Sequence, residues 1–354
     1  MVTSRSAISI LRMGLVCWGL LALPCALQGQ GPSVAGGSAT ENLLAGRFAW
    51  RVGPPLISHP ESTTDTYVLI KDPSVVYFKR RWRLFCSVIR QGAPYQTEYL
   101  SFRDWNSVGT ARRHILRIHK DGRYGAPQVF YFAPHRKWYL ICQAMHDTWN
   151  PQYAAAYATS SDITDPESWS SLKPLGALPA DGKPGLDFWI ICDDRKAHLF
   201  FTTLDGCMWR EETSLSNFPT EWSRPVLALQ DDIFEAAHIY RVKGMDRYLA
   251  VIEAQSGHGW RYFKAYLAER LEGQWKPLAA TKELAFASMA NTEHIEPRWT
   301  DCISHGELLR AGYDQRLEVD PARLRFLFQG VLDRECQGRG YGQIPWRLGL
   351  LTAR

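Results

Sequence analysis

Long apolar runs are almost missing from this sequence of 354 residues. The one stretch that is nearly all apolar, Met13 to Ala26, is about 14 residues long, whereas a bilayer-spanning helix needs roughly 20. No later segment approaches that length. We therefore expect no membrane span.

Blocks of like charge are also missing. Lys and Arg are scattered and form no run of five or more, and the formal net charge is only +5. Hydrophobic residues make up 45% and charged residues 22% of the chain, which is close to the globular average. These values exclude wholesale disorder, and we expect no nucleic-acid partner.

Cysteine patterns typical of metal sites are absent too. No Cys-x-x-Cys and no Cys/His ligand spacing occurs. Three cysteines stand late in apolar runs, which favours buried free thiols over disulfides. A bridge involving Cys302 or Cys336 remains open if the compartment is oxidising. The cysteines beyond the N-terminal segment are Cys86, Cys142, Cys192, Cys207, Cys302 and Cys336.

The N-terminal segment has the features of an export signal. Arg5 and Arg12 precede the apolar stretch, and Pro24 marks a break at its end. We expect residues 1–28 to be a signal peptide and residues 29–45, rich in Gly, Ser, Gln and Thr, to be a linker. The mature protein is therefore expected to be secreted, or periplasmic.

Residues 46–354 show the pattern of an all-β domain. The segment has no long helical periodicity, and short Val, Ile, Tyr, Phe and Trp runs alternate with Gly, Pro, Asp and Asn. Aromatic residues are abundant, with 14 Trp, 15 Tyr and 15 Phe. A short helix or turn is expected only near residues 162–169.

A paired-strand unit recurs along this domain. Each copy has a small or acidic residue, an apolar strand, a charged turn and an aromatic-rich strand. The copies begin at Asp72, Ala126, Asp187, Glu235 and Ser304, about 50 to 70 residues apart. This spacing fits a four-stranded blade, so we predict a five-bladed β-propeller. A two-sheet sandwich of the same length would not explain the repeated unit.

The propeller model places three carboxylates around one cavity. The first strand of each blade lines the central channel, so Asp72, Asp187 and Glu235 are expected to converge in one funnel. Such a group suits glycoside hydrolysis, which needs a protonated carboxyl group and an ionised one. Glu235 has an apolar flank, which suits the acid, and Lys71 precedes Asp72, which suits the base.

Motifs in the same order along most of residues 48–352 resemble glycoside hydrolase family 62, the arabinofuranosidases that act on arabinoxylan. The resemblance lies in Lys71-Asp72-Pro-Ser-Val-Val, Phe130-Tyr-Phe-Ala-Pro, Pro184-Gly-Leu-Asp187, Phe200-Phe-Thr-Thr-Leu-Asp205-Gly, Ile233-Phe-Glu235, Arg261-Tyr-Phe, Ser304-His305-Gly-Glu307 and Pro345-Trp-Arg-Leu-Gly-Leu-Leu-Thr. It implies a five-bladed propeller and an inverting mechanism.

The resemblance also implies a role for each acid. Asp72 matches the general base, Glu235 the general acid, and Asp187 the acid that tunes the pKa of the donor. An inverting pair stands roughly 6.5–9.5 Å apart to admit the attacking water. That separation is therefore expected between Asp72 and Glu235.

Other positions of the family's site carry over in the same way. Lys71, Arg261 and Tyr341 match residues that line the arabinose pocket. His305 matches a residue near the axis that contacts a calcium ion completed mostly by water. From the residues alone, Trp105 is a candidate to stack on a xylose ring, with a buried structural role equally open. Gln143, Asp205 and Glu253 are further candidates for binding sugar hydroxyls, or for satisfied buried polar groups.

The sequence thus predicts a secreted, inverting, exo-acting α-L-arabinofuranosidase. Its substrate is expected to be arabinoxylan or another arabinose-decorated polysaccharide, and the protein is expected to be a monomer. Two alternatives remain open: a β-xylosidase or arabinanase with the same fold and acids, or a non-catalytic sugar-binding propeller.

Overall fold

The computed structural model describes residues 37–58, 66–120, 122–177, 180, 182–256 and 260–354. The chain divides into two units, Met1–Gly31 and Pro32–Arg354, and every described residue belongs to the second. The expected signal peptide, residues 1–28, lies outside the described residues. None of the helices in the described ranges is long and apolar enough to cross a membrane.

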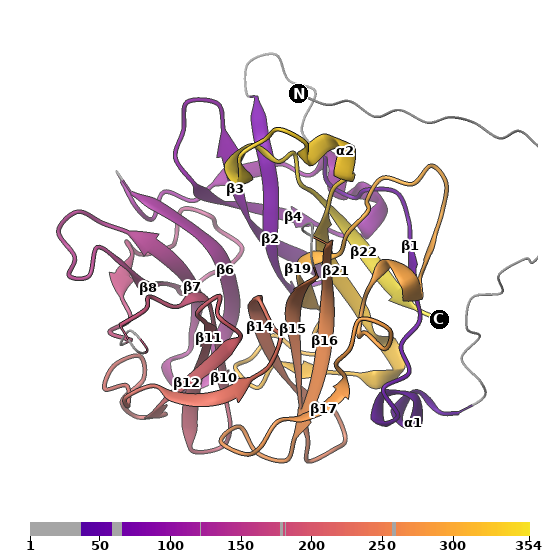
Figure 1. The fold of residues 1–354 in the computed structure, drawn as a ribbon. Helices are drawn as coiled ribbons and strands as arrows, with labels where there is room; N and C mark the ends of the chain where they lie inside the picture. The colour runs from indigo at the N-terminus through magenta and orange to yellow at the C-terminus, as the bar shows by residue number, and fades with distance from the viewer. Residues whose placement is uncertain (1–36, 59–65, 121, 178–179, 181, 257–259) are drawn as a thin grey trace, which may run out of the picture. The chain divides into compact units, whose positions relative to one another are not determined.

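Five separate β-sheets form the blades of a five-bladed β-propeller, as the repeat predicted (Figure 1). Blade 1 consists of β2 (Tyr67–Phe78), β3 (Arg81–Arg90), β4 (Gln96–Phe102) and β5 (Arg113–Ile115). Blade 2 consists of β6 (Arg123–Phe132), β7 (Lys137–Met145), β8 (Tyr153–Ser160) and β9 (Lys173–Pro174). Blade 3 consists of β10 (Leu186–Cys192), β11 (Lys196–Thr202), β12 (Cys207–Ser214) and β13 (Val226–Gln230).

The last two blades each have five strands. Blade 4 has the order β17 (Lys276–Ala279), β16 (Trp260–Ala268), β15 (Tyr248–Ser256), β14 (Glu235–Val242), β20 (Glu318–Val319). Blade 5 has the order β18 (Thr292–His294), β1 (Trp50–Val52), β22 (Arg347–Ala353), β21 (Arg325–Gly330), β19 (Ser304–Leu308). The first strand of the chain therefore completes the last blade, between β18 and β22.

Helices are few and short. They are α1 (Ala39–Leu44), α2 (Asp333–Cys336) and the 3₁₀ helices η1 (Trp105–Thr110), η2 (Ala133–His135), η3 (Met289–Asn291), η4 (Pro321–Arg323) and η5 (Tyr341–Gln343). The segment 162–169 consists of turns and bends. The expected linker, residues 29–45, is corrected in part, because α1 begins inside it. Ser38 and Glu41 form a capping box that satisfies the first amides of this helix.

Each inner strand carries a β-bulge at the same level. The pairing register shifts after Lys71, Gly125, Leu186, Glu235 and Ser304. In the first four blades the next residue has a positive φ, which is rare without glycine: 50° at Asp72, 49° at Ala126, 54° at Asp187 and 52° at Ala236. Bulges of this kind redirect side chains at functional rims.

Below the bulges, polar side chains join neighbouring inner strands around the axis. Ser74 accepts from Val129 N at 3.0 Å, and Gln128 accepts from Ile190 N at 2.8 Å. The indole of Trp189 donates to Ile239 O at 2.9 Å. These bonds run from blade 1 to 2, 2 to 3 and 3 to 4, so buried backbone groups near the channel are satisfied by the adjacent blade.

The link from blade 5 to blade 1 is a buried ion pair. Arg310 lies 2.8 Å from Glu307, and both side chains are fully buried. The same guanidinium donates to the carbonyls of Val75 and Val129, each at 2.9 Å. One cation therefore connects blade 5 with blades 1 and 2.

The six cysteines after residue 28 are all free thiols, as the apolar context predicted. Five are buried, and Cys336 is half-buried. Burial raises the pKa of Cys86, Cys142 and Cys192, which keeps these thiols protonated.

Candidate functional site

The bulges correct the alignment of the five inner strands. The sequence repeat aligned Glu235 and Ser304 with Asp72. In the structure both precede the bulge, as Lys71 does, and the residues at the level of Asp72 are Ala236 and His305. The sequence pattern missed this offset of one residue because a bulge depends on backbone dihedrals.

The backbone amides at the bulges form hydrogen bonds to the neighbouring blades, and these bonds hold the acids in place. In four blades the amide of the bulge residue donates to a polar side chain on the second strand of the preceding blade. The pairs are Asp72 N to Gln329 Oε1 at 2.9 Å, Ala126 N to Ser87 Oγ at 2.7 Å, Asp187 N to Gln143 Oε1 at 3.1 Å and His305 N to Glu253 Oε2 at 2.8 Å.

Blade 4 departs from this rule. Thr202 occupies the corresponding second-strand position of blade 3, but its hydroxyl bonds to no other described group. The amide of Ala236 donates instead to Asp187 Oδ2, at 3.0 Å. Because Ala236 follows Glu235 directly, this bond holds the Asp187 carboxylate close to the backbone of the second acid.

Asp72 is a buried carboxylate surrounded by polar partners. Its Oδ1 lies 2.9 Å from Lys71 Nζ and 3.4 Å from His305 Nδ1, and its Oδ2 accepts from the Tyr95 hydroxyl at 3.3 Å. Burial by itself would raise the pKa of Asp72. The Lys71 ammonium and the His305 imidazole outweigh that effect and lower the pKa below its ordinary value. Asp72 is therefore ionised at neutral pH, as a general base must be.

Glu235 is paired with a buried arginine. Its Oε1 accepts from Arg261, whose guanidinium also lies 2.8 Å from Glu253 Oε1. Glu235 is 8% exposed, whereas Glu253 has no exposed surface. Glu253 is also bonded to Ser304 Oγ at 2.9 Å and to His305 N. Glu253 therefore anchors Arg261, and Glu235 is the carboxyl group that a ligand can reach.

Asp187 is the acid whose pKa is raised most clearly. Burial comes first among the causes, followed by the negative charges of Glu235 and Asp72. Its Oδ2 lies 3.6 Å from His305 Nδ1, which is also the neighbour of Asp72. Asp187 therefore retains its proton at a pH where Asp72 is ionised.

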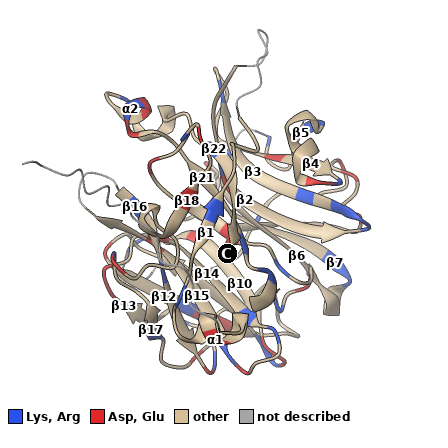
Figure 2. Cartoon of the chain, turned by 90° about the vertical axis from the view of Figure 1, so that its right-hand side faces the viewer, with Lys and Arg blue, Asp and Glu red and all other residues tan. Residues whose placement is uncertain are grey.

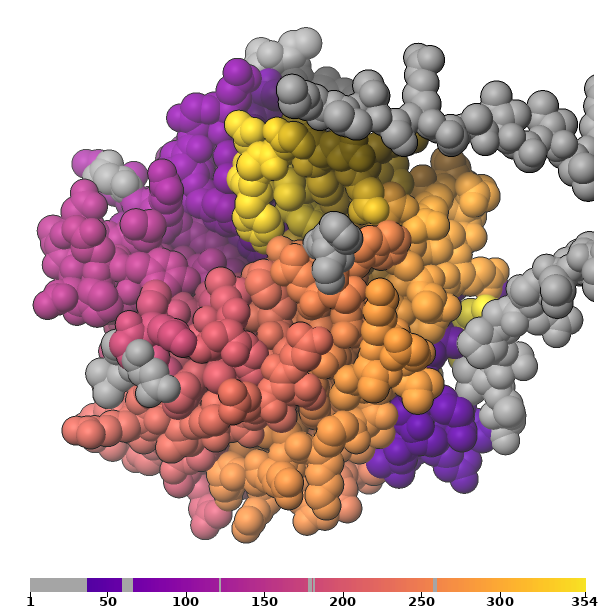
Figure 3. Space-filling model, in the orientation of Figure 1, coloured from indigo at the N-terminus to yellow at the C-terminus, as the bar shows by residue number. Residues whose placement is uncertain are grey.

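Lys71, Arg261 and Tyr341 lie at the outer edge of the acid cluster. The Tyr341 hydroxyl lies 3.3 Å from Lys71 Nζ, and the Arg261 guanidinium lies 5.5 Å from the centre of the Tyr341 ring. Tyr341 is 45% exposed, so its ring faces solvent beside the charged cluster. In Figure 2 basic and acidic segments meet in the middle of the domain. In Figure 3 the yellow C-terminal segment, which carries Tyr341, packs against the purple first blade.

The structure brings every residue of the predicted site together except Trp105. Trp105 packs against Trp82 and Phe102, with ring centres 5.1 and 5.0 Å apart. Trp82 pairs with Tyr77 near the far end of β2, five residues and about 16 Å of strand away from Asp72. Trp105 is half-buried among these rings and therefore has the structural role that the sequence left open.

The other polar candidates have structural partners. Gln143 accepts from Tyr153 and from the Asp187 amide, and Glu253 is the anchor of Arg261. Asp205 forms a partly exposed ion pair with Lys183. Glu253 is thus a satisfied buried group, the second of the two roles that the sequence left open, whereas Gln143 is half-buried and its Oε1 is engaged within the protein.

Sequence reasoning did not assign a role to Tyr95, the hydroxyl partner of Asp72. Gly125 makes its position possible, because a Cβ at residue 125 would lie 2.6 Å from the Tyr95 ring. The glycine at the bulge of blade 2 was the available signal. Its meaning depends on a tyrosine thirty residues earlier, which a single sequence does not connect to it.

The donors around His305 do not by themselves form a calcium site. Calcium prefers about six to eight oxygen ligands. Within 4 Å of the imidazole the structure gives two carboxylate oxygens, from Asp72 and Asp187. Since both belong to the acid cluster, no chemical step is assigned to a metal.

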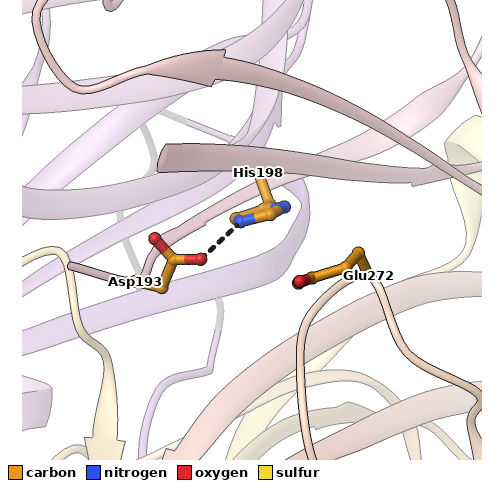
Figure 4. A group of neighbouring side chains, drawn as sticks. All are labelled: Asp193, His198 and Glu272. Carbon is orange, nitrogen blue, oxygen red and sulfur yellow. Dashed lines mark hydrogen bonds and ion pairs between the residues drawn. The ribbon is translucent and has the colours of Figure 1, made fainter. Parts of the chain in front are cut away.

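Another group of three potential metal ligands occurs on the described part of the chain, away from the acids. Asp193, His198 and Glu272 come from the β10–β11 turn, β11 and the β16–β17 turn, and their ligand atoms lie within 4.8 Å of one another (Figure 4). His198 Nδ1 lies 3.1 Å from Arg210, which can only donate, so Nε2 carries the proton and donates to Asp193 at 3.0 Å. The imidazole therefore offers no lone pair to a metal.

The comparisons agree with this geometry. Residues 57–352 match the family model described as glycosyl hydrolase family 62. The curated alpha-L-arabinofuranosidase C of Cellvibrio japonicus is 38% identical over 318 residues. That alignment covers 88% of this chain but 48% of the relative, so the chain spans about half the length of that protein.

Two solved structures extend the comparison. The catalytic domain of the family 62 alpha-L-arabinofuranosidase of Coprinopsis cinerea has a TM-score of 0.80 and 38% identity, with 88% of this chain and 98% of that chain covered. A family 62 hydrolase in complex with xylotriose has a TM-score of 0.78 and 34% identity, covering 86% and 97%.

Proposed function

Because this chain belongs to glycosyl hydrolase family 62, we propose that it is an inverting, exo-acting α-L-arabinofuranosidase that releases L-arabinofuranose side chains from arabinoxylan. The cluster of Asp72, Asp187 and Glu235, buried between Lys71 and Arg261, carries the proposal. A relative binds xylotriose, which supports a xylan backbone as the substrate.

The proposed mechanism gives each acid one task. Ionised Asp72 takes a proton from a water molecule, which attacks the anomeric carbon from the face opposite the leaving group. Glu235 donates a proton to the glycosidic oxygen as the bond to the xylose unit breaks. Asp187 shares the negative environment of Glu235, and its own bond to the Ala236 amide keeps it in place.

The cations orient these acids. Lys71 holds Asp72 ionised, and Arg261 connects Glu235 to the buried anchor Glu253. Tyr341 lies against both cations at the solvent side. Substrate binding there would exclude water from the Lys71–Asp72 pair and strengthen the interaction.

The product anomer is the first test of this proposal. An inverting reaction releases the β-anomer of arabinose, which ¹H NMR detects before mutarotation. Fresh α-anomer would overturn the roles of Asp72 and Glu235. Failure to release arabinose from both arabinoxylan and an aryl arabinofuranoside would overturn the activity itself.

Two substitutions separate the acid from the base. Glu235→Gln should lower kcat on arabinoxylan by about 10²–10⁴-fold, but far less on an aryl arabinofuranoside whose phenolate leaves without protonation. Asp72→Asn should lower kcat on both substrates alike, because both need the activated water. The reverse pattern would exchange the two assignments. A sugar-binding propeller would show no turnover in any form.

Export and calcium are separate proposals that rest on the sequence. We propose that residues 1–28 are removed on export, which N-terminal sequencing of secreted protein would test. We also propose a calcium ion beside His305 whose ligands are supplied mostly by water, because the protein donors there are too few to complete its shell. Metal analysis should then find one calcium per chain that is lost in His305→Ala, whereas absence of calcium from both proteins would contradict it.

A further inference from the structure

A basic cleft, lined by Arg90, Arg113, Arg117 and Lys120, lies at the edge of blade 1. It is a cavity of about 540 Å³ between the end of β3, the strands β4 and β5, residues 116–120 and the start of β6. Among the described lining residues, Glu167 is the one carboxylate. The cleft therefore carries an excess of positive charge and is within the size range of ligand sites.

Two of its cations have no partner among the residues that the structure describes. Arg117 and Lys120 are exposed, and no described residue lies within hydrogen-bonding or ion-pair distance of either side chain. The other two are fixed in the wall. Arg113 lies 3.4 Å from Glu98, and Arg90 donates to Gln96 at 3.3 Å. The cleft thus combines a rigid basic wall with two cations available to an external anion.

One residue separates this cleft from the catalytic centre. Gln96 lines the cleft, while the hydroxyl of its neighbour Tyr95 donates to Asp72 Oδ2 at 3.3 Å. Tyr124 also lines the cleft, and its amide donates to the Tyr95 carbonyl at 3.1 Å. The cleft wall and the partner of Asp72 are therefore neighbours along the chain, which suits a ligand long enough to contact both, such as a glycan.

We propose that the basic cleft binds a uronate carboxylate of the same glycan chain that presents the arabinose. The preferred substrate is then an acidic, uronate-bearing arabinose-decorated polysaccharide rather than a neutral one. This inference rests on the proposed arabinofuranosidase function, because the adjacency to Asp72 selects a glycan as the source of the carboxylate. The charge on Arg117 and Lys120 supplies the attraction.

The test compares two forms of one polymer: arabinoxylan that carries uronic acid, and the same preparation with its carboxyl groups reduced to alcohols. The wild-type protein should have a kcat/KM about 10-fold higher on the acidic form, the size expected for a charge-assisted contact. Raising the salt concentration should remove this advantage, because exposed charges are screened. Equal rates on the two forms would overturn the inference.

The matched variants are Arg117→Gln/Lys120→Gln and the control Arg224→Gln/Lys282→Gln, which removes the same charge from exposed positions in blades 3 and 4. The first should lose the preference for the acidic polymer and keep the wild-type rate on an aryl arabinofuranoside. The control should keep both properties. A preference that survives in the first variant, or is lost equally in the control, would overturn the assignment of the cleft.

Two outcomes keep the inference and the proposed function apart. No arabinose from any substrate, the aryl arabinofuranoside included, would reject the proposed function. Normal release with equal rates on both polymers would reject only the cleft as a uronate site.

Loss of binding to a DNA oligonucleotide in Arg117→Gln/Lys120→Gln, with equal rates on both polymers, would assign the cleft to nucleic acid and likewise overturn the inference.

Discussion

The position and the pKa of the Asp187 side chain are both set by its neighbours. Its carboxylate replaces a second-strand side chain in the ring of amide contacts, and one of its oxygens lies 3.6 Å from His305 Nδ1. Burial and the negative charges of Glu235 and Asp72 raise the pKa of Asp187, so this side chain retains its proton at a pH where an isolated carboxylate would lose it.

Asp187→Asn removes this carboxyl group but keeps an oxygen for the Ala236 amide. The group whose pKa is raised by burial and by the neighbouring carboxylates is then gone, so the alkaline limb of the pH–rate profile should move to lower pH. We expect kcat at the optimum to fall by about 10²-fold. A profile of kcat against pH checks this, and an unmoved alkaline limb would contradict the coupling.

Tyr95→Phe tests the other end of the cluster. The Tyr95 hydroxyl stabilises the ionised form of Asp72, so its loss should raise the pKa of Asp72. The acid limb of the profile should therefore move to higher pH, by about 0.5 unit for a bond of this length. Tyr153→Phe, which removes a hydroxyl bonded to Gln143, is the control and should leave the acid limb in place.

The sequence alone identified the individual acids but not their contacts. Lys71 and Asp72 are adjacent, so their pairing could be read directly. The Gln329 contact that fixes the Asp72 amide spans 257 residues, and the His305 contacts join three blades. Such pairs follow from closure of the propeller, which no local pattern contains.

At the scale of the element, the bulge is the recurring device. The repeat located each inner strand, but β2 and β6 begin at Tyr67 and Arg123, before Asp72 and Ala126, and the repeat misaligned Glu235 and Ser304 by one residue. Apolar patterning reports which residues are buried, and every residue from Glu235 to Tyr240 is buried, so it carries no information on the kink. The helix α1 was missed for the opposite reason: its capping box was present, but the polar composition around it indicated a linker.

Ala126→Gly tests the strain at a bulge. Alanine at a φ of 49° costs about 1–2 kcal/mol, which glycine relieves at a similar cost in unfolded-chain entropy and lost methyl burial. The free energy of unfolding should therefore stay within about 0.5 kcal/mol of wild type. The control Ala156→Gly, in the regular strand β8, should lose about 1 kcal/mol or more. Equal losses in urea denaturation would contradict the strain.

At the scale of the whole molecule, the five-bladed ring was predictable because paired strands repeat along the entire domain, and the family was predictable from the motifs that resemble it. The contacts that close the ring could not be predicted from the sequence. The Glu307–Arg310 pair was visible only as charged residues near Ser304, and its burial between blades 5, 1 and 2 depends on the assembled ring.

Arg310→Met should destabilise the ring by about 3–5 kcal/mol, because it leaves the Glu307 carboxylate buried without its cation. Burial already raises the pKa of Glu307, so the uncompensated charge is expensive. Glu307→Gln/Arg310→Met should recover part of this loss, since no isolated charge remains. Denaturant unfolding checks both variants, and a cost below about 1 kcal/mol for Arg310→Met would contradict the role of the pair.

The position of β1 in the sheet determines when the fifth blade can fold. This strand is synthesised first, but both of its partners, β18 and β22, belong to the last part of the chain. During translation its edges stay open while four complete blades emerge. The fifth blade can form only after the ribosome has released the C-terminal strand, so a nascent or prematurely terminated chain has an unfinished sheet that is prone to pair with other chains.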